Sequence, residues 1–436
     1  MSSEQVLVEA IASTAKNSIV GGPFGSNLVS KDYVPNGVPV IRGQNMGNKW
    51  VGGEFVFVTE EKALSLAPNK ARPGDLIFTQ RGTLGQVAIV PDTPYLEYII
   101  SQSQMKLSVD PQKADVEYLY YLFLGPEQQE YIRNNAIQTG VPHTNLGILK
   151  KTPITLPTLV EQQKIAGVLG SLDERIVLLR ETNSTLEAIA QTLFKSWFVD
   201  FEPVHARARG EQLAGLAPEV TALFPDSFEE SALGMIPKGW QAEPLDEIAD
   251  FLNGLALQKY PPEGDETLPV IKIAQLRKGD TVGADRASRN IKPEYIIQNG
   301  DVLFSWSGSL EVEVWCGGEG ALNQHLFKVT SQRFQKWFYL RWTKAHLINF
   351  KHIAASKATT MGHIQRKHLT EAMVVVPSSQ VLAEADKIFG PLLDQWINNA
   401  EQAQTLANLR DTLLPRLISG QLRLPDAEQQ LKDLAV

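Results

Sequence analysis

LVEQQKIAGVLGSLDERIVLLRETNSTLEAIAQTLFKSWFV, residues 159–199, is the stretch that decides the fold of this chain. Apolar or small residues recur in it at alternating steps of four and three, which is the spacing of a coiled-coil seam. No proline interrupts the stretch, so it predicts one helix, about 60 Å long at about 1.5 Å per residue. A helix of this length with one narrow seam requires a partner. The predicted seam consists of Ile165, Leu169, Leu172, Ile176, Leu179, Asn183, Leu186, Ala190, Leu193 and Trp197.

The partner is predicted in the same chain, about 220 residues later. TLEAIAQTLFKSWFVD (185–200) aligns with TLANLRDTLLPRLISG (405–420), and the seam of this second helix is expected to include Trp396, Leu406, Leu413 and Leu417. Asn183 is the one amide in the first seam. It either fixes the register between the two helices as a buried residue or faces solvent at the edge of the seam.

The same offset relates the segments that precede each helix. TGVPHTNLGILKKTPITLP (139–157) aligns with TTMGHIQRKHLTEAMVVVP (359–377), VPVIRGQNM (38–46) resembles LPVIKIAQL (268–276), and PGDLIF (73–78) resembles NGDVLF (299–304). The chain is therefore a tandem duplication. The predicted parts are a first domain (1–157), a helix (158–201), a linker (202–239), a second domain (240–378), a second helix (379–421) and a tail (422–436).

Each domain is expected to mix short strands with one longer helix. VPVIRG, EFVFVT, DLIFTQ and QVAIV are predicted strands of the first domain, and LPVIKIA, DVLFSW and HLFKVT of the second. The helices are predicted over 116–136, with a break near Gly125-Pro126, and over 334–354. The fold class is therefore α+β: two tandem α/β domains with mainly antiparallel or mixed sheets, separated by two long antiparallel coiled-coil helices.

Composition limits where the protein acts. With 436 residues, of which 43% are hydrophobic, the chain can form two or more cores. The single cysteine, Cys316, excludes a disulfide framework and indicates a reducing compartment. No apolar run is long enough to span a membrane, and the polar start MSSEQ is unlike a signal peptide. We expect a soluble cytoplasmic protein without a membrane partner.

The charge distribution is informative about nucleic-acid partners. The net charge is −8, but residues 1–150 carry 12 Lys and Arg against 14 Asp and Glu, and residues 235–375 carry 17 against 15. Most of the acidic excess lies on the helices and the linker. Two nearly neutral domains permit DNA binding, most readily with a partner that adds positive surface.

Catalytic motifs are missing from the sequence. GGPFGSN lacks the spacing of a phosphate-binding loop, and YPPEG (260–264) lacks the acid or amide that precedes the prolines in an amino-methyltransferase signature. The seven histidines are scattered and the cysteine stands alone, so spacing assembles no metal site. The sequence predicts a non-catalytic chain with no cofactor of its own.

What remains is a set of polar residues at matching loop positions of the two domains. Arg, Gln and Asn side chains can read base edges in the major groove, although loop Asn residues more often serve turns and loop histidines often bond the local backbone. The candidates in the first domain are Arg42, Gln44, Asn45, Gln80, Arg81, Thr83, Gln104, His143 and Thr144. Those in the second are Lys272, Gln275, Arg277, Ser307, Ser309, His325, Thr359, Thr360, His363 and Gln365.

An ordered set of motifs spans nearly the whole chain: RPGDLIF, ISQSQMKL, TGVPHTNL, LPTLVEQQKIAGVLGSLDERI, TLFKSWFVDFEPV, SALGMIPKGW and LRDTLLPRLISGQL. In this order they resemble the motifs of the specificity subunit of a type I restriction-modification enzyme. Two features depart from the family pattern: the second helix carries Pro391 and Pro415, and no IPKGW segment precedes the first domain.

The resemblance implies a mechanism. Each domain would be a target recognition domain that reads one half of a split double-stranded DNA site, and the paired helices would set the distance between the halves. The helices would also dock two methyltransferase subunits, joined by a motor-nuclease restriction subunit in phage defence. S-adenosylmethionine would bind to the methyltransferase subunits, and ATP and Mg would bind to the motor subunit. The alternatives are a coiled-coil scaffold without a nucleic-acid role and a self-contained modification enzyme.

Overall fold

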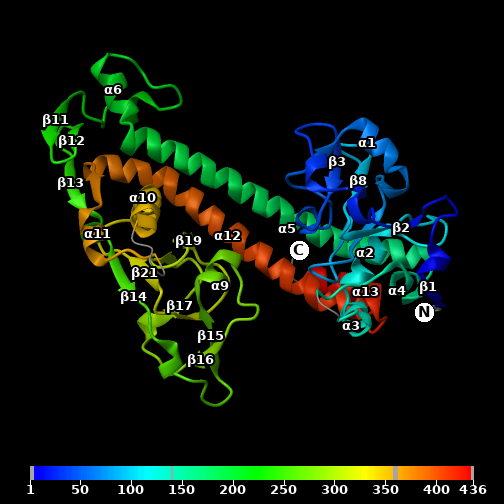
Figure 1. Cartoon of the computed structure of the whole chain (residues 1–436). Helices are drawn as coiled ribbons and strands as arrows, with labels where there is room; N and C mark the ends of the chain where they lie inside the picture. The colour runs from blue at the N-terminus through cyan, green and yellow to red at the C-terminus, as the bar shows by residue number, and fades with distance from the viewer. Residues whose placement is uncertain (1–3, 139–140, 357–361, 434–436) are drawn as a thin grey trace. The chain divides into compact units, whose positions relative to one another are not determined.

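A computed structural model of the chain describes residues 4–138, 141–356 and 362–433 (Figure 1). The chain divides into two compact units, and both long helices contribute to each of them. The first unit comprises the residues up to Glu174 together with those from Ala407 onward, and the second comprises Arg175–Leu406. Each unit therefore contains one globular domain and part of the helix pair.

The described part of the first unit contains two four-stranded sheets. One sheet is antiparallel, in the order β2 (Ile19–Gly21), β9 (Gln104–Leu107), β6 (Leu76–Thr79) and β7 (Val87–Ile89). The other is mixed, because β3 runs parallel to β8, and its order is β4 (Val56–Val58), β3 (Val38–Ile41), β8 (Tyr98–Ile100) and β5 (Lys70–Ala71). A separate antiparallel pair joins β1 (Glu4–Leu7) to β10 (Pro153–Leu156).

Helices pack against these sheets. The predicted break at Gly125-Pro126 is confirmed: Gly125 is extended, and Pro126 begins a new helix because its missing N–H is not needed in a first turn. Phe123 packs edge-on against Phe78 of β6, with ring centroids 4.8 Å apart. The helices of the first domain and of the tail are α1 (Glu60–Ser65), α2 (Val116–Leu124), α3 (Pro126–Asn135), α4 (Leu146–Lys150) and α13 (Leu424–Asp433).

The second unit repeats the sheets of the first, strand for strand. Its antiparallel sheet has the order β14 (Asp250–Asn253), β21 (Leu326–Thr330), β18 (Val302–Ser305) and β19 (Val312–Val314). Its mixed sheet has the order β16 (Arg286–Ser288), β15 (Thr267–Ile271), β20 (Gly320–Leu322) and β17 (Ile296–Ile297), with β15 parallel to β20. The pair β13 (Gln241–Pro244) and β22 (Met373–Val376) corresponds to β1 and β10. The duplication thus extends to topology.

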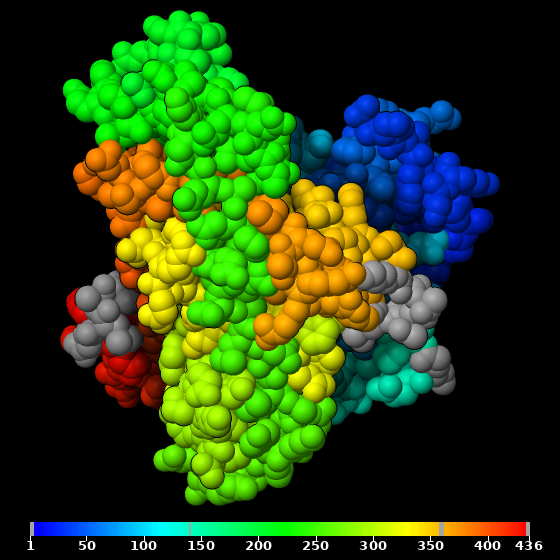
Figure 2. Space-filling model, turned by 90° about the vertical axis from the view of Figure 1, so that its left-hand side faces the viewer, coloured from blue at the N-terminus to red at the C-terminus, as the bar shows by residue number. Residues whose placement is uncertain are grey.

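The linker contributes short elements to the second unit. Figure 2 shows this segment in green at the top of the view, next to orange residues of the second long helix. Phe224 of the linker and Trp240, the residue directly after it, complete an aromatic cluster with Trp197 and Phe198. The elements of the linker are α6 (Glu202–Ala208), α7 (Pro218–Thr221), β11 (Phe228–Ser231) and β12 (Gly234–Pro237), and the domain helices are α8 (Leu245–Ile248), α9 (Ile273–Lys278), α10 (Lys336–Ser356) and α11 (Arg366–Glu371).

The two long helices are α5 (Leu159–Phe194) and α12 (Ser379–Ile418). In the second unit they run antiparallel, because Asn183 bonds Trp396 whereas Phe194, eleven residues later, lies against the earlier residue Phe389. The predicted seam faces inward. In the first unit Ile165, Leu169, Leu172, Leu413 and Leu417 are buried; in the second, Ile176, Leu179, Asn183 and Leu406 are buried, and Leu186, Leu193 and Trp396 are half-buried.

The helix ends differ from the prediction in one respect. Helix α5 stops at Phe194, and residues Lys195–Val199 form a wider π-turn in which the N–H of Asp200 bonds the carbonyl of Lys195 at 2.8 Å. The wider turn buries Trp197 and Phe198 in the aromatic cluster. Helix α12, by contrast, continues through Pro391 and Pro415. No helix within the described residues is long and apolar enough to cross a membrane.

Candidate nucleic-acid interface

In the first unit, the loops that carry the candidate residues converge. These loops follow β3, follow β6, connect β8 to β9 and precede α4. Arg81 and His143 pair as an antiparallel bridge, so the loop after β6 lies beside the segment before α4. Three backbone hydrogen bonds fix the arrangement: Ser101 N to Ile41 O at 2.9 Å, Gln80 N to Ser103 O at 2.6 Å and Thr144 N to Gln80 O at 2.9 Å. The sheet topology thus gathers residues that lie about 100 positions apart in sequence.

The second unit gathers its loops in the same way. Ser307 and His363 form the bridge that corresponds to Arg81 and His143. The N–H of Trp306 bonds the carbonyl of His325 at 3.3 Å, and the N–H of Ile364 bonds the carbonyl of Trp306 at 3.0 Å. The two units therefore present equivalent loop clusters built from different side chains.

A pair of glycines allows this convergence. A Cβ on Gly22 would lie 2.0 Å from the carbonyl oxygen of Ser101, and a Cβ on Gly254 would lie 2.2 Å from that of Asn323. Any larger residue would push the β8–β9 connection, or its equivalent, out of place. Sequence analysis missed both glycines. The available signal was their shared position, directly after the first strand of the antiparallel sheet in each copy.

Six of the candidate residues in the first unit remain accessible, and three do not. Gln44, Arg81 and Thr83 are exposed, and Arg42, Gln80 and His143 are half-buried. Asn45, Gln104 and Thr144 are buried. Arg81 is the accessible cation in the centre of the cluster, and it forms no ion pair with any residue that the structure describes.

Two of the three buried residues bond their own loops. The amide of Asn45 donates to the carbonyls of Gly52 (3.0 Å) and Glu54 (2.9 Å), and its oxygen accepts from the N–H of Arg42 (3.0 Å). Gln104 is fully buried, and its side chain meets the hydroxyl of Ser101. We therefore leave these two residues out of the proposed contact surface.

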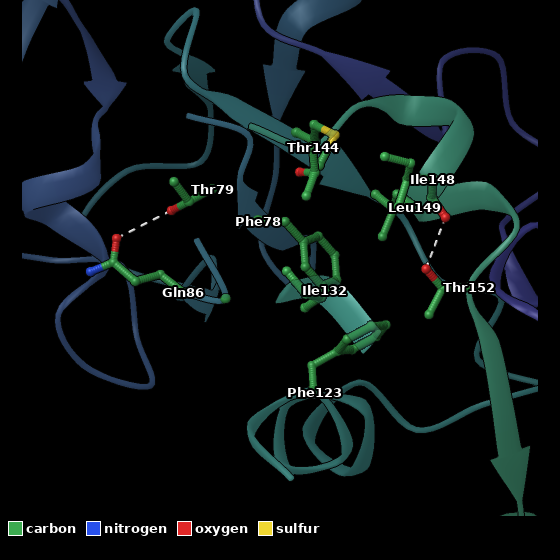
Figure 3. Close-up of a pocket in the computed structure, with 11 residues that line it drawn as sticks. Phe78, Thr79, Gln86, Phe123, Ile132, Thr144, Ile148, Leu149 and Thr152 are labelled. Atoms are coloured by element: carbon green, nitrogen blue, oxygen red, sulfur yellow. Dashed lines mark hydrogen bonds between the residues drawn. The ribbon is translucent and has the colours of Figure 1, made fainter. Parts of the chain in front are cut away.

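Thr144 also faces inward. Figure 3 shows it above a small pocket whose walls are mainly apolar and come from β6, α2, α3 and α4. On opposite sides of the pocket, Thr79 donates to the Oε1 of Gln86 at 3.2 Å, and Thr152 donates to the carbonyl of Ile148 at 2.9 Å. Thr144 lies in the wall of this pocket and not on the outer surface, so it too is left out.

The candidate residues of the second unit divide similarly. Lys272, Arg277, Ser309 and Gln365 are exposed, and His325 and His363 are half-buried. Gln275 and Ser307 are buried: the oxygen of Gln275 accepts from the N–H of Lys272 at 3.3 Å, and the hydroxyl of Ser307 bonds the Nδ1 of His325 at 2.9 Å. Gln275 and Ser307 are therefore omitted from the contact surface. Thr359 and Thr360 lie outside the described residues.

The two exposed cations among the candidate residues of the second unit are paired. Lys272 forms an ion pair with Asp285, and the guanidinium of Arg277 lies 3.7 Å from a carboxylate oxygen of Glu311. Exposed pairs of this kind contribute little to stability and exchange readily for other anions such as phosphate. Both cations therefore remain available to a polyanion.

Trp306 stands at the centre of the second cluster. Its indole N–H donates to the side-chain oxygen of Asn253 at 2.9 Å, and its ring centroid lies 5.9 Å from that of His325 and 6.3 Å, edge-on, from that of His363. Trp306 is half-buried and Asn253 is exposed. Asn253 was not among the predicted residues, because only the pairing of β14 with β21 brings it beside the tryptophan.

The described residues contain no group of three or more His, Cys, Asp or Glu side chains placed to hold a metal ion. Cys316 is buried, and burial raises the pKa of its thiol to about 11, which keeps it protonated and unreactive at neutral pH. The accessible groups in both clusters are hydrogen-bond donors and acceptors, cations and one indole ring. Such groups are suited to a polyanion that also presents hydrogen-bond donors and acceptors at its edges.

Comparison with known proteins identifies the chain. A sequence family described as "Type I restriction modification DNA specificity domain" matches twice, over residues 27–188 and 237–409. The type I restriction enzyme MjaIX specificity subunit of Methanocaldococcus jannaschii is 26% identical over 425 residues, which cover 94% of this chain and 92% of that protein. The HindI specificity subunit of Haemophilus influenzae is 24% identical, with coverage of 89% and 95%.

A solved structure shares the fold. The S subunit of a type I restriction-modification system from M. genitalium superimposes with a TM-score of 0.54 at 18% sequence identity, covering 95% of this chain and 96% of that one. The two family matches fall on the two copies of the duplication, and together they span most of the sequence. The chain therefore belongs to the family of type I restriction-modification DNA specificity subunits.

Proposed function

We propose that the chain reads a split double-stranded DNA target, with one recognition domain on each half-site. Membership of the family makes it a DNA-recognition subunit without catalytic chemistry of its own and excludes the scaffold and self-contained enzyme alternatives. The observation that supports two readers is the repeated sheet topology with different side chains at equivalent loops. Two similar frameworks with different polar groups are suited to two different base sequences.

The proposed contact surface consists of the accessible residues of the two clusters. In the first domain these are Arg42, Gln44, Gln80, Arg81, Thr83 and His143. In the second they are Lys272, Arg277, Ser309, His325, His363 and Gln365, to which we add Trp306 and Asn253. The domains are nearly neutral, so the positive charge needed for tight DNA binding has to come in part from a partner.

The helix pair acts as the spacer in this proposal. An amide within an apolar seam favours one register, because any other register leaves its polar atoms unpaired. Asn183 is 8% exposed, donates to the carbonyl of Trp396 at 2.8 Å and accepts from the amide of Asn399 at 3.0 Å. A spacer with a fixed register couples two modest half-site affinities into one specific affinity.

The helices also dock methyltransferase subunits in this proposal, two per chain as the family resemblance implies. Val177 and Leu178 are consecutive residues of α5 and are 50% and 56% exposed. Adjacent exposed apolar residues on a long helix are suited to burial against a partner. The motor-nuclease restriction subunit would join this assembly. S-adenosylmethionine would bind to the methyltransferase, and ATP and Mg would bind to the motor. The site of action would be the cytoplasm, where the DNA is.

Docking can be tested with the double variant Val177→Asp/Leu178→Asp. Docking would bury two carboxylates without partners, so the double variant should no longer co-purify with the methyltransferase subunit. Both positions are exposed in the free chain, so its melting temperature should be unchanged. Thr185→Asp, an exposed position on the same helix, is the control. Retention of the methyltransferase by the double variant would place the docking surface elsewhere.

The function itself is tested by mapping methylated adenines. The full chain is expressed with its methyltransferase subunit in cells that otherwise lack adenine methylation, and the modified positions are sequenced. We expect one motif of two short defined segments separated by a gap of fixed length. The methyltransferase subunit expressed alone should leave the DNA unmodified. An ungapped motif, or no dependence on this chain, would contradict the proposal.

A further inference from the structure

An ion cluster in the second unit joins the recognition domain to the helix of the other copy. The guanidinium of Arg341 on α10 donates two hydrogen bonds to the carboxylate of Glu187 on α5, at 2.7 and 2.8 Å. The ammonium of Lys344 lies 3.1 Å from the same carboxylate and 3.4 Å from Glu313 on β19. Arg341 and Lys344 are three residues apart and therefore lie on one face of α10.

The cluster is partly buried and charged. The side chain of Arg341 is 7% exposed and that of Glu187 is 31% exposed. Burial alone would raise the pKa of Glu187, but the hydrogen bond from Arg341 and the charges of Arg341 and Lys344 outweigh it and hold that pKa below its usual range. The carboxylate is therefore ionised at neutral pH, and both cations are paired. A two-point planar contact of this kind fixes orientation as well as distance.

A second contact on α10 fastens the same domain to its own helix. The indole N–H of Trp337 donates to a carboxylate oxygen of Asp386 on α12 at 2.9 Å, and its ring stacks on that of Phe389 at 4.6 Å. Trp337 and Arg341 are one helical turn apart. The recognition domain is thus held to α12 through Trp337 and to α5 through Arg341, which leaves it little freedom to rotate on the helix pair.

The first unit has a contact at the equivalent position but with different chemistry. Tyr121 is the sixth residue of α2, as Arg341 is of α10. Its hydroxyl donates to Asp173 of α5 at 2.6 Å, and Asp173 also accepts from Arg410 of α12 at 2.6 Å. A neutral hydroxyl therefore takes the place of the guanidinium, so the two attachments are not interchangeable.

We propose that Glu187, Arg341 and Lys344 are positioning residues that fix the second recognition domain on the helix pair. They thereby restrict the gap between the half-sites, an inference that rests on the function proposed above. With the cluster intact, the second domain meets DNA at one distance only. With the cluster broken, the domain stays attached through apolar packing of α10, with Trp337 on Phe389 of α12 and Trp342 on Phe194 of α5, and it can shift on these contacts because none of them fixes orientation as the two-point ion pair does. Targets with a slightly longer or shorter gap then become acceptable.

The test uses Glu187→Gln and Glu187→Asp in the full chain, expressed with its methyltransferase subunit. Glu187→Gln removes the charge at nearly constant shape. Glu187→Asp keeps the charge but shortens the side chain, so both guanidinium bonds cannot form without movement. Glu181→Gln is the matched control, because Glu181 is exposed on the same helix and forms no ion pair with a described residue. The readout is adenine methylation at the wild-type gap and at gaps one base pair longer or shorter.

Wild type and Glu181→Gln should confine methylation to one gap. Both Glu187 variants should raise methylation at the neighbouring gaps, relative to the wild-type gap, by on the order of tenfold. Variants that methylate only the wild-type gap, at whatever level, would overturn the proposal. Loss of folded protein in both variants would also overturn it, since the cluster would then be needed for folding and not for positioning. If the wild type itself yields no gapped motif, the proposed function fails instead.

Discussion

At the scale of single residues, the structure decides between two interpretations of Asn183. The sequence left open whether this amide is buried or faces solvent, and the structure places it inside the seam. Its partner Asn399 is 4% exposed and accepts a hydrogen bond from Gln395 at 2.7 Å. Two hydrogen-bonded asparagines therefore lie inside the seam, and the exposed Gln395 bonds the second of them from its edge.

Replacing Asn183 with Leu should cost stability and loosen the register. The change leaves the buried amide of Asn399 and the carbonyl of Trp396 without their partner, a penalty of about 1–3 kcal/mol in the free energy of unfolding. Chemical denaturation measures this loss, and methylation mapping measures the gap. The double variant Asn183→Leu/Asn399→Leu should recover stability but not gap selectivity. If the single variant shows both an unchanged free energy of unfolding and an unchanged gap, the register hypothesis is wrong.

Arg81 is the residue of the first cluster from which we expect the largest single effect on recognition. Arg81→Ala should weaken discrimination at one base pair of one half-site by about 1–3 kcal/mol and leave the other half-site unchanged. Competition binding with single-base variants of the mapped target measures this. Arg133→Ala, an exposed arginine of α3 without an ion pair among the described residues, controls for lost charge. An equal loss for every DNA sequence would instead make Arg81 a phosphate contact.

The burial of single residues could be predicted in the helices, where periodicity constrains it. It could not be predicted in the loops. The seam residues Leu169, Ile176 and Leu413 are buried because their spacing leaves no other face for them. Asn45 and Gln104 were predicted as readers but bond their own loops, because a loop sequence does not show which polar atoms its backbone needs. Asn253 was missed because strand pairing, and not sequence proximity, brings it to Trp306.

At the scale of elements, the long helices were predicted well except at α5's last turn. The π-turn at Lys195–Val199 arises from the aromatic cluster around Trp197, which no seam pattern shows. Helix α12 continues through Pro391 because the neighbouring residues Phe389 and Leu393 are buried in the core of the second unit. Their packing outweighs the loss of a backbone hydrogen bond. The break between α2 and α3 was predictable, because Gly-Pro is a local signal.

Helix length should set the recognised gap. Inserting one heptad of about seven residues after Glu174 in α5, matched by the same insertion after Leu406 in α12, keeps the seam in phase. It lengthens the pair by about 10 Å, which corresponds to about three base pairs at roughly 3.4 Å each. Methylation mapping of the variant should show the same two half-sites with a longer gap. An unchanged gap would show that the helices are not the spacer.

At the scale of the whole molecule, the duplication has a direct consequence for engineering. Each recognition domain has its own pair of sheets and its own loop cluster, and the strand order is the same in both. Sequence similarity between the copies was sufficient to predict two domains. It could not show that the pairing is identical strand for strand, since the matching segments cover only a few of the strands.

Exchanging the first domain for that of another family member should change one half-site only. The exchange is best made at residue 157, because a cut at 150 would separate β1 from its partner β10. Methylation mapping should show a new sequence in one half of the target, with the other half and the gap retained. Alteration of both halves would contradict the model of two independent readers.

The strand pairs β1–β10 and β13–β22 also bear on how a recognition domain can be exchanged by genetic recombination. In each copy the chain enters and leaves the recognition domain through one antiparallel ribbon, so the two ends of the domain are neighbours in space. A genetic crossover that replaces everything between these two ends transfers the whole domain and disturbs only that strand pair. One recombination event could therefore give the chain a new DNA specificity, while the two long helices need no compensating change.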